Sequence, residues 1–252
     1  MITVSIIGTG NVAFHLAKAF SKAQMIHMQF VAGRSREKLV AFQSFANTTM
    51  QLSALGQSDI ILIAVSDDSI AQVAAEIPET NALIVHTSGS TSLEVLEPRE
   101  RIGVFYPLQT FSKNKELNYK KIPFLIEAKL ESDLKLLSTL PRALQAEHFS
   151  MNSKERAAYH LAAVFSNNFT NHILTEAETL CEQHRISFQL LKPLLEETIE
   201  KAFEKGPENS QTGPAKRNDS KTIEKQLAAL QTTEQKDLYT TLTKAIQKHY
   251  ER

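Results

Sequence analysis

The chain has 252 residues and equal numbers of basic and acidic side chains, 28 of each, so its formal net charge is zero. That balance gives no overall field for nucleic acid or for an acidic membrane surface, and no apolar run approaches the roughly 18 residues of a membrane span. A single cysteine excludes an intrachain disulfide, and the first ten residues lack the charged start of a signal peptide. We therefore expect a soluble cytoplasmic protein with one large or two modest domains.

Apolar strands alternate with helices through the first 150 residues. Apolar, often β-branched runs predict strands at residues 2–7, 26–32, 59–65, 82–85, 101–105 and 123–126. Helical spacing or a capping residue predicts helices at about residues 12–20, 36–45 and 68–77. This alternation indicates βαβ units, and the continuous apolar strands indicate a sheet covered on both faces. The predicted fold class is α/β, a Rossmann-like, doubly wound, mostly parallel sheet.

The remainder of the chain is predicted to be all helical. No glycine or proline interrupts the helical pattern from Ser153 to about residue 184, and a second helix is expected at about residues 188–205. A loop with two Gly-Pro pairs follows, Asp219 or Ser220 can start the next helix, and the last helix ends at about residue 248. The sequence therefore divides into an α/β domain, residues 1–150, and an all-helical C-terminal domain, residues 151–252.

A glycine-rich turn joins the first predicted strand to the first predicted helix. The pattern G-x-G-x-x-A is formed there by Gly8, Thr9, Gly10, Asn11, Val12 and Ala13. Gly8 permits a tight turn, Gly10 leaves room for a pyrophosphate to approach the backbone, and Ala13 allows close packing of the helix. The helix N-terminus would offer unpaired N–H groups to the anion. We expect this turn to bind a dinucleotide; the alternative is a glycine turn that binds nothing.

The end of the second predicted strand favours NADP over NAD. An NAD site usually carries Asp or Glu there, which accepts a hydrogen bond from the ribose 2′-hydroxyl. Here the strand is followed by Arg34, Ser35 and Arg36, with no acid before Glu37. These three side chains could surround a 2′-phosphate with charge-assisted hydrogen bonds. A solvated basic turn is the alternative interpretation.

Three further loops leave predicted strands at the edge where a doubly wound sheet binds its ligand. Val65 and Ser66 are expected to line the sugar and nicotinamide of the nucleotide. His86 could donate a proton near the nicotinamide, and Gln109 could contact the substrate. The alternatives are structural: a helix cap, a histidine satisfied by backbone, and a packed turn.

The long predicted helix carries a polar stripe. At 3.6 residues per turn, His160, Asn167, Asn171 and Glu178 return to one face. His160 and Asn167 could therefore be catalytic and Asn171 could bind substrate in a cleft, although a solvent-facing side has the same pattern. In the later loop, Arg217 could bind an anionic group of a substrate or simply lie at the surface.

Motifs for other chemistries do not occur in the sequence. The eight histidines are scattered without the spacing of a metal-ligand pair. Neither the G-x-S-x-G motif of hydrolases nor a phosphate-binding P-loop motif is found. We therefore expect no metal site and no hydrolase or kinase activity.

Four segments together resemble a family of NADP-dependent oxidoreductases. They are residues 7–13 (IGTGNVA), 105–112 (FYPLQTFS), 159–168 (YHLAAVFSNN) and 212–219 (TGPAKRND). The family pairs a Rossmann-like domain with a helical C-terminal domain of unknown function, DUF2520, and is similar to coenzyme-F420-dependent NADP oxidoreductases. The resemblance implies a dinucleotide cleft between the two domains and a homodimer formed through the helical domain. It does not imply a particular substrate or a use of F420.

The long helix also resembles that of β-hydroxyacid dehydrogenases, in which a catalytic lysine precedes an asparagine by one helical turn. Val164 stands at the lysine position here, so His160, one turn earlier, is our candidate for the proton-transfer group. The leading hypothesis is NADP(H)-dependent hydride transfer to or from a small carbonyl, imine or hydroxyl substrate. Imine reduction, as in pyrroline-carboxylate reductases, is one form of it. The alternative is a nucleotide-binding sensor or regulatory protein without turnover.

Overall fold

The computed structural model describes residues 1–251, which form two compact units that divide between residues 166 and 167. The last strand of the sheet ends at Ser150, the predicted domain boundary. The first helix beyond that strand, α6 (Ser153–Ala163), belongs to the first unit. Its contacts with the sheet, described below, explain why the compact unit extends past the strands.

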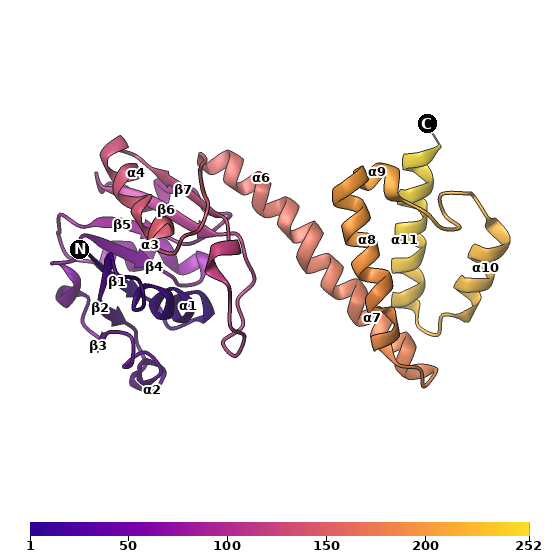
Figure 1. Cartoon of the computed structure of the whole chain (residues 1–252), viewed down its shortest axis with the longest axis horizontal. Coiled ribbons are helices and arrows are strands. Elements are labelled where there is room, and N and C mark those ends of the chain that lie inside the picture. The colour runs from indigo at the N-terminus through magenta and orange to yellow at the C-terminus, as the bar shows by residue number, and fades with distance from the viewer. Residues whose placement is uncertain (252) are drawn as a thin grey trace. The chain divides into compact units, whose positions relative to one another are not determined.

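One eight-stranded sheet forms the centre of the first unit (Figure 1). Its strands are β1 (Ile2–Ile7), β2 (Ile26–Ala32), β3 (Asn47–Thr49), β4 (Ile60–Ile63), β5 (Leu83–His86), β6 (Ile102–Pro107), β7 (Phe124–Ala128) and β8 (His148–Ser150). Their spatial order is β3-β2-β1-β4-β5-β6-β7-β8, and every neighbouring pair is parallel except β6 and β7. The predicted Rossmann-like, mostly parallel sheet is confirmed.

The sheet is covered on both faces, as its continuous apolar strands predicted. Side chains alternate along β4: Ile60 and Leu62 join one buried cluster, whereas Ile61 and Ile63 join a second cluster on the other face. Besides α6, this unit contains the helices α1 (Asn11–Phe20), α2 (Arg36–Val40), α3 (Ile70–Glu76), α4 (Glu131–Leu137) and α5 (Thr139–Ala143). Residues of α1 contribute to the first cluster and residues of α3 to the second.

One local expectation for this unit is wrong, and the edge strand β3 was missed. The helix expected at residues 36–45 is the single-turn helix α2, since the chain leaves the helix after Val40 and continues as turns. The edge strand β3 was not predicted, because three polar residues at a sheet edge carry no apolar periodicity.

The described part of the chain beyond Ser150, residues 151–251, contains helices and no strands, as predicted. The helices are α6 (Ser153–Ala163), α7 (Thr170–Gln183), α8 (Lys192–Lys205), α9 (Pro207–Ser210), α10 (Ser220–Ala229) and α11 (Thr233–Tyr250). Asn152 is the N-cap of α6 and forms a capping box with Glu155, so the helix begins at Ser153. Asp219 caps α10 by accepting the N–H of Thr222, as expected.

A π-helical turn, Val164–Phe169, lies between α6 and α7. The predicted long helix is therefore not uniform, because a π turn closes i→i+5 hydrogen bonds and is wider than an α turn. A face calculated at 3.6 residues per turn does not continue in register through this segment. The spacing argument that put His160 on one face with Asn167 and Asn171 is thus weakened by the structure.

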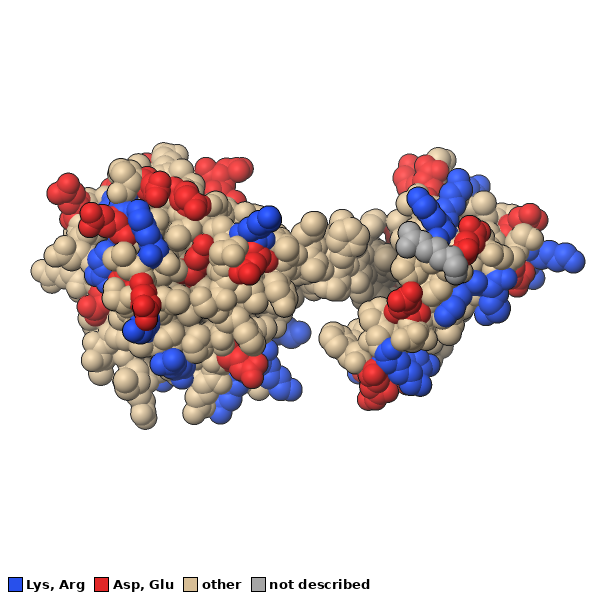
Figure 2. Space-filling view, turned by 90° about the horizontal axis from the view of Figure 1, so that it is seen from above, with Lys and Arg blue, Asp and Glu red and all other residues tan. Residues whose placement is uncertain are grey.

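Charges of both signs are interspersed over the face of the molecule displayed in Figure 2, and neither sign forms a continuous patch there. This distribution agrees with the balanced composition. Among the described helices, none combines the length and apolar character that crossing a membrane requires.

Candidate functional site

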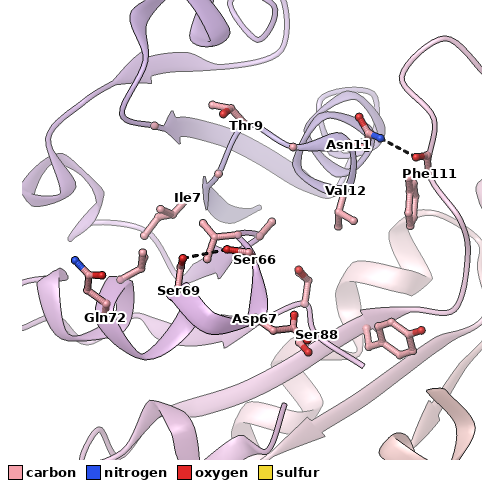
Figure 3. A pocket seen from close by; sticks show the side chains of 18 of the residues that line it. Ile7, Thr9, Asn11, Val12, Ser66, Asp67, Ser69, Gln72, Ser88 and Phe111 are labelled. Atoms are coloured by element: carbon pink, nitrogen blue, oxygen red, sulfur yellow. Dashed lines mark hydrogen bonds between the residues drawn. The ribbon is translucent and has the colours of Figure 1, made fainter. Parts of the chain in front are cut away.

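A pocket of about 770 Å³ opens at the point where the strand order of the sheet reverses. β1 and β4 are adjacent there, and the chain continues from them to opposite sides of the sheet. Doubly wound sheets bind ligands at this switch point, beyond the carboxyl ends of the strands. The lining includes the turn after β1, the turn after β4 and the turn after β5 (Figure 3).

The two glycines of the first turn are suited to their positions for different reasons. Gly8 has a φ of +135°, and a Cβ at this position would lie 2.1 Å from the carbonyl oxygen of Ala64. Only glycine therefore fits there in the protein itself. Gly10 has an ordinary φ of −78°, and a Cβ on it would meet nothing within 4 Å. The protein leaves open the space that a side chain at Gly10 would occupy.

Gly10 is also the N-cap of α1, and no side chain caps that helix end. The first N–H groups of a ten-residue helix are thus available at the pocket, with the positive end of the helix dipole behind them. Thr9, Asn11 and Val12 line the pocket as well, whereas Ala13 is fully buried and supports close packing of α1. An uncapped helix end with open space before it fits a phosphate group.

The basic turn after β2 contributes one arginine to this pocket. Arg34 lines it and is exposed, while Ser35 caps α2 by accepting the N–H of Lys38 at 3.4 Å. Arg36 is exposed as the first residue of α2 and is not among the lining residues. Gly33 brings this turn against the phosphate loop, since a Cβ there would lie 2.6 Å from Cγ2 of Thr9.

The loop after β6 closes another side of the pocket. Asn11 Nδ2 donates to the carbonyl oxygen of Phe111 at 2.9 Å, a contact that ties this loop to α1 (Figure 3). Gln109 lines the pocket, and its Oε1 accepts the N–H of Thr110 at 2.8 Å. Asn11, predicted to bind cofactor, is thus already engaged in holding the loop that carries Gln109.

The turn after β4 presents small polar groups. Val65 and Ser66 line the pocket, and Ser66 Oγ lies 3.0 Å from Oγ of Ser69 (Figure 3). Asp67 also lines it, and its Oδ2 accepts a hydrogen bond from Oγ of Ser90 at 2.7 Å. The turns after β4 and β5 are therefore linked to each other at the pocket.

His86 is enclosed in the core rather than exposed to the pocket. Its Nδ1 accepts the backbone N–H of Ser88 at 3.2 Å, so its Nε2 is the nitrogen that donates to the carbonyl oxygen of Ser92, 3.3 Å away. Burial, together with the charge of Arg156, lowers the pKa of His86 to about 4. A neutral, fully buried ring with both nitrogens bonded fits the structural alternative, and its predicted catalytic role finds no support in this placement.

His160 does reach the pocket, and it does so with a tyrosine. Tyr106 Oη lies 3.0 Å from Nδ1 of His160, and both side chains line the pocket. The sequence-based reasoning selected His160 and overlooked Tyr106. The signal was available, because Tyr106 lies at the carboxyl end of a predicted strand, next to a motif already noted for Gln109.

The base of α6 is fastened to the sheet by a buried ion pair. Arg156 is almost fully buried and pairs with Glu127 of β7, and its Nη2 donates to the carbonyl oxygen of Thr91 at 2.6 Å. Oγ of Ser153 donates to the same carboxylate at 2.8 Å. These contacts explain how His160, one turn further along α6, is held at the pocket.

The remaining candidates lie in the second unit. Asn167, Asn171 and Arg217 are all exposed. Asn167 falls within the π-helical turn and Asn171 in α7. Within residues 1–251, no three His, Cys, Asp or Glu side chains gather as metal ligands would.

Comparison with known proteins connects these features to a family. Residues 3–88 match the model of the coenzyme-F420-dependent NADP oxidoreductases, and residues 122–246 match the domain of unknown function DUF2520. No match was found among curated proteins.

Solved structures match over the whole chain. A provisionally assigned NADP oxidoreductase from Bacteroides fragilis is 34% identical, with a TM-score of 0.89 over 100% of this chain and 98% of its own. An imine reductase from Pseudomonas sp. is 17% identical, with a TM-score of 0.74 over 98% of this chain and 94% of its own. An imine reductase from Myxococcus stipitatus, solved with NADP⁺, is 16% identical, with a TM-score of 0.70 over 99% and 93%. At the identity shared with the Bacteroides fragilis protein, this chain belongs to the same NADP oxidoreductase-like family, which joins a Rossmann-like domain to DUF2520.

Proposed function

We propose that this protein is an NADP(H)-dependent oxidoreductase that transfers a hydride to or from a small substrate. The observation that carries the proposal is the open, uncapped helix end at Gly10 beside Arg34 in one pocket at the switch point. NADP⁺ occupies the imine reductase from Myxococcus stipitatus, whose fold is similar. No feature of the pocket calls for a deazaflavin such as F420.

The proposed division of labour follows the position of each group along the pocket. The N–H groups at the start of α1 bind the pyrophosphate, and Arg34 binds the 2′-phosphate, with Arg36 and Ser35 at its rim. Val65 and Ser66, in the turn after β4, contact the sugar next to the nicotinamide. NADP(H) supplies the hydride chemistry, and the chain supplies binding, orientation and a proton.

The reacting end is assigned to the group of side chains that includes His160. His160 and Gln109 line the pocket, so we assign a role at the reacting end to the former and substrate contact to the latter. Asn167, Asn171 and Arg217 are proposed to orient the substrate. All three side chains are exposed to solvent. Alanine variants at these positions should raise the KM for the substrate and leave the Kd for NADPH unchanged.

The test is a titration of the purified protein with NADPH and with NADH, followed by nicotinamide fluorescence. NADPH should bind more tightly, and Arg34→Ala should weaken NADPH binding by about 10- to 150-fold while leaving NADH binding nearly unchanged, because charge-assisted hydrogen bonds contribute about 1.5–3 kcal/mol. Lys38→Ala is the matched control, since Lys38 is exposed on α2 and does not line the pocket. If neither NADPH nor NADH bound to the protein, the proposal would be refuted.

A non-catalytic NADP(H) sensor is the alternative function. It would bind NADPH with the same preference, yet it would show no NADPH oxidation with a panel of ketones, aldehydes and cyclic imines. The measured rate of NADPH oxidation therefore separates the two functions.

We also propose a homodimer in the cytoplasm. Of residues 167–251 in the second unit, only Cys181, Ala215, Gln235 and Thr243 are buried, so these helices have little core of their own. Large apolar side chains are exposed there, among them Leu190 at 78%. No Asp, Glu, Lys or Arg occurs from residue 167 to 175, at the start of this unit. A second copy of the chain, whose helical domain has the same apolar faces, would bury them.

The dimer is tested by light scattering coupled to size exclusion. The wild type should elute with twice the chain mass, and Leu190→Glu combined with Leu194→Glu should shift it toward the monomer. Lys192→Glu, on the same helix as Leu194 and also exposed, should leave the mass unchanged. A monomeric wild type at micromolar concentration would overturn the proposal.

A further inference from the structure

Tyr106 is placed where a reacting group would be, at the carboxyl end of β6 and in the wall of the pocket. Its hydroxyl lies 3.0 Å from Nδ1 of His160. The two rings meet edge to face, with centroids 5.8 Å apart and an interplanar angle of 75°. The hydrogen bond and the ring contact together fix the direction of the phenol group.

The backbone of Gly89 packs directly against the side chains of Tyr106 and His160. A Cβ at Gly89 would lie 2.7 Å from Nδ1 of His160 and 2.7 Å from Cζ of Tyr106. Any other residue would thus push the pair away from the loop after β5. That loop is itself fixed, since Oγ of Ser88 accepts the N–H groups of Ser90 at 3.2 Å and Thr91 at 3.0 Å.

The electrostatic environment keeps the phenol protonated. Burial raises the pKa of Tyr106, and the negative charge of Asp67 raises it further. The Asp67 carboxylate is held at the pocket by the hydrogen bond from Ser90. A protonated donor is therefore present across the whole neutral pH range.

The hydrogen-bond inventory of the two side chains distinguishes their roles. A tyrosine hydroxyl has one proton to donate and two lone pairs to accept with. In the tautomer of His160 that carries its proton on Nδ1, Tyr106 accepts this hydrogen bond and can at the same time donate its own proton into the pocket. Because Nδ1 of His160 is bonded to Tyr106 in this arrangement, we assign His160 the role of orienting the tyrosine.

We propose that Tyr106 is the proton donor of the reaction and that His160 positions it; this rests on the proposed NADP(H)-dependent function. In the reducing direction, hydride from NADPH bonds to the carbon of a C=O or C=N group, and the π electron pair moves to the heteroatom. The heteroatom takes the proton of Tyr106 as its O–H bond breaks. Nδ1–H of His160 stabilises the resulting tyrosinate, which regains a proton from water. Oxidation runs through the same steps in reverse.

The experiment follows the tyrosines by NMR and does not need the natural substrate. The chain contains five tyrosines, so labelling of the ring carbon Cζ with ¹³C gives five signals, and Tyr106→Phe identifies the one that belongs to Tyr106. The labelled wild type is titrated with pH while bound to NADPH and, separately, to NADP⁺. The oxidised nicotinamide is positively charged and the reduced one is neutral.

A charge of opposite sign within about 4–6 Å lowers a pKa by about 1–3. The NADP⁺ complex should therefore contain at least about tenfold more Tyr106 tyrosinate than the NADPH complex at the same pH below the midpoint. His160→Phe should lower the tyrosinate fraction, because the donated hydrogen bond is lost, and His160→Gln should restore part of it. Tyr119 is the internal control: its hydroxyl bonds to His15 and it does not line the pocket.

Different results would refute the proposed function and the role of Tyr106. If the wild type binds neither nucleotide, the proposed function is wrong and this inference falls with it. If the wild type binds both and the Tyr106 signal is the same in the two complexes, the NADP(H) site stands and Tyr106 is not the proton donor. A response at Tyr106 equal to that at Tyr119 would have the same meaning.

Discussion

The phosphate loop offers a sharp test, because its two glycines should fail in opposite ways when each is replaced by alanine. In Gly8→Ala the new Cβ would collide with the carbonyl of Ala64 at a φ of +135°. Strain at such a backbone angle costs about 1–3 kcal/mol, and overpacking adds about 1–3 kcal/mol. The variant should lose on the order of 10 °C in Tm, at about 2–4 °C per kcal/mol for a unit of this size.

Gly10→Ala should leave the fold intact and remove the ligand. Its φ of −78° suits alanine, and the new methyl group would meet no protein atom within 4 Å. The free energy of unfolding should change by no more than about 1 kcal/mol, since replacing glycine contributes about 0.4–1 kcal/mol and the poorer cap offsets it. The methyl group would stand where the pyrophosphate must approach. Loss of one charge-assisted hydrogen bond, about 1.5–3 kcal/mol, predicts NADPH binding weakened by about 10- to 150-fold.

Thermal unfolding by circular dichroism and NADPH titration of the same two samples provide the assay. The expected result is a low Tm for Gly8→Ala and a normal Tm with poor NADPH affinity for Gly10→Ala. If Gly10→Ala bound NADPH as tightly as the wild type, the pyrophosphate would not lie at this helix end, and the reasoning from open space would be refuted.

Three further outcomes are expected. Glu127→Ala should lower the free energy of unfolding by about 3–5 kcal/mol in urea titrations, because Arg156 would be left buried without its partner; Glu131→Ala, which removes an exposed pair, should change it by less than about 1 kcal/mol. The pKa of His86 is lowered from 6.5 to about 4, so the unfolded chain binds an additional proton between these values. Stability should be complete above pH 6.5 and fall by about 3 kcal/mol toward pH 4; a His86→Gln variant with the same slope would contradict this. Gly89→Ala should shift the Tyr106 signal in the labelled protein and change the Kd for NADPH by less than about threefold, whereas an unmoved Tyr106 signal would show that the loop yields instead.

Periodicity and turn chemistry were sufficient to predict the α/β class and most strands. Runs such as the one that forms β4 are buried on both faces, and this burial is encoded directly in a continuous apolar stretch. The same holds for the glycine turn, whose context between a strand and a helix is local. β3 and the short α2 could not be predicted in this way, because an edge strand of Asn47, Thr48 and Thr49 and a single helical turn depend on neighbours more than on their own residues.

In the candidate site, too, some residues could be identified from local sequence patterns, whereas others are brought together only by tertiary packing. Residues that act through backbone geometry, such as Gly8 and Gly10, were identified from the chain alone, since a turn that needs no side chain leaves a visible mark in the sequence. The pairing of Tyr106 with His160 joins residues 54 positions apart, and no spacing rule connects them. His86 shows the converse, because a histidine after a strand reads as a candidate until burial encloses it.

By itself the sequence determined the α/β class, most of the strands and the phosphate-binding turn, and it predicted a preference for a nucleotide with a 2′-phosphate. Each of these depends on residues that are adjacent or one helical turn apart. Only the tertiary structure decided which polar side chains share the pocket. That choice depends on how β6, the loop at Gly89 and α6 pack against one another, and on the π turn that alters the register of the helix. Contacts between distant segments are products of packing, which no local pattern records.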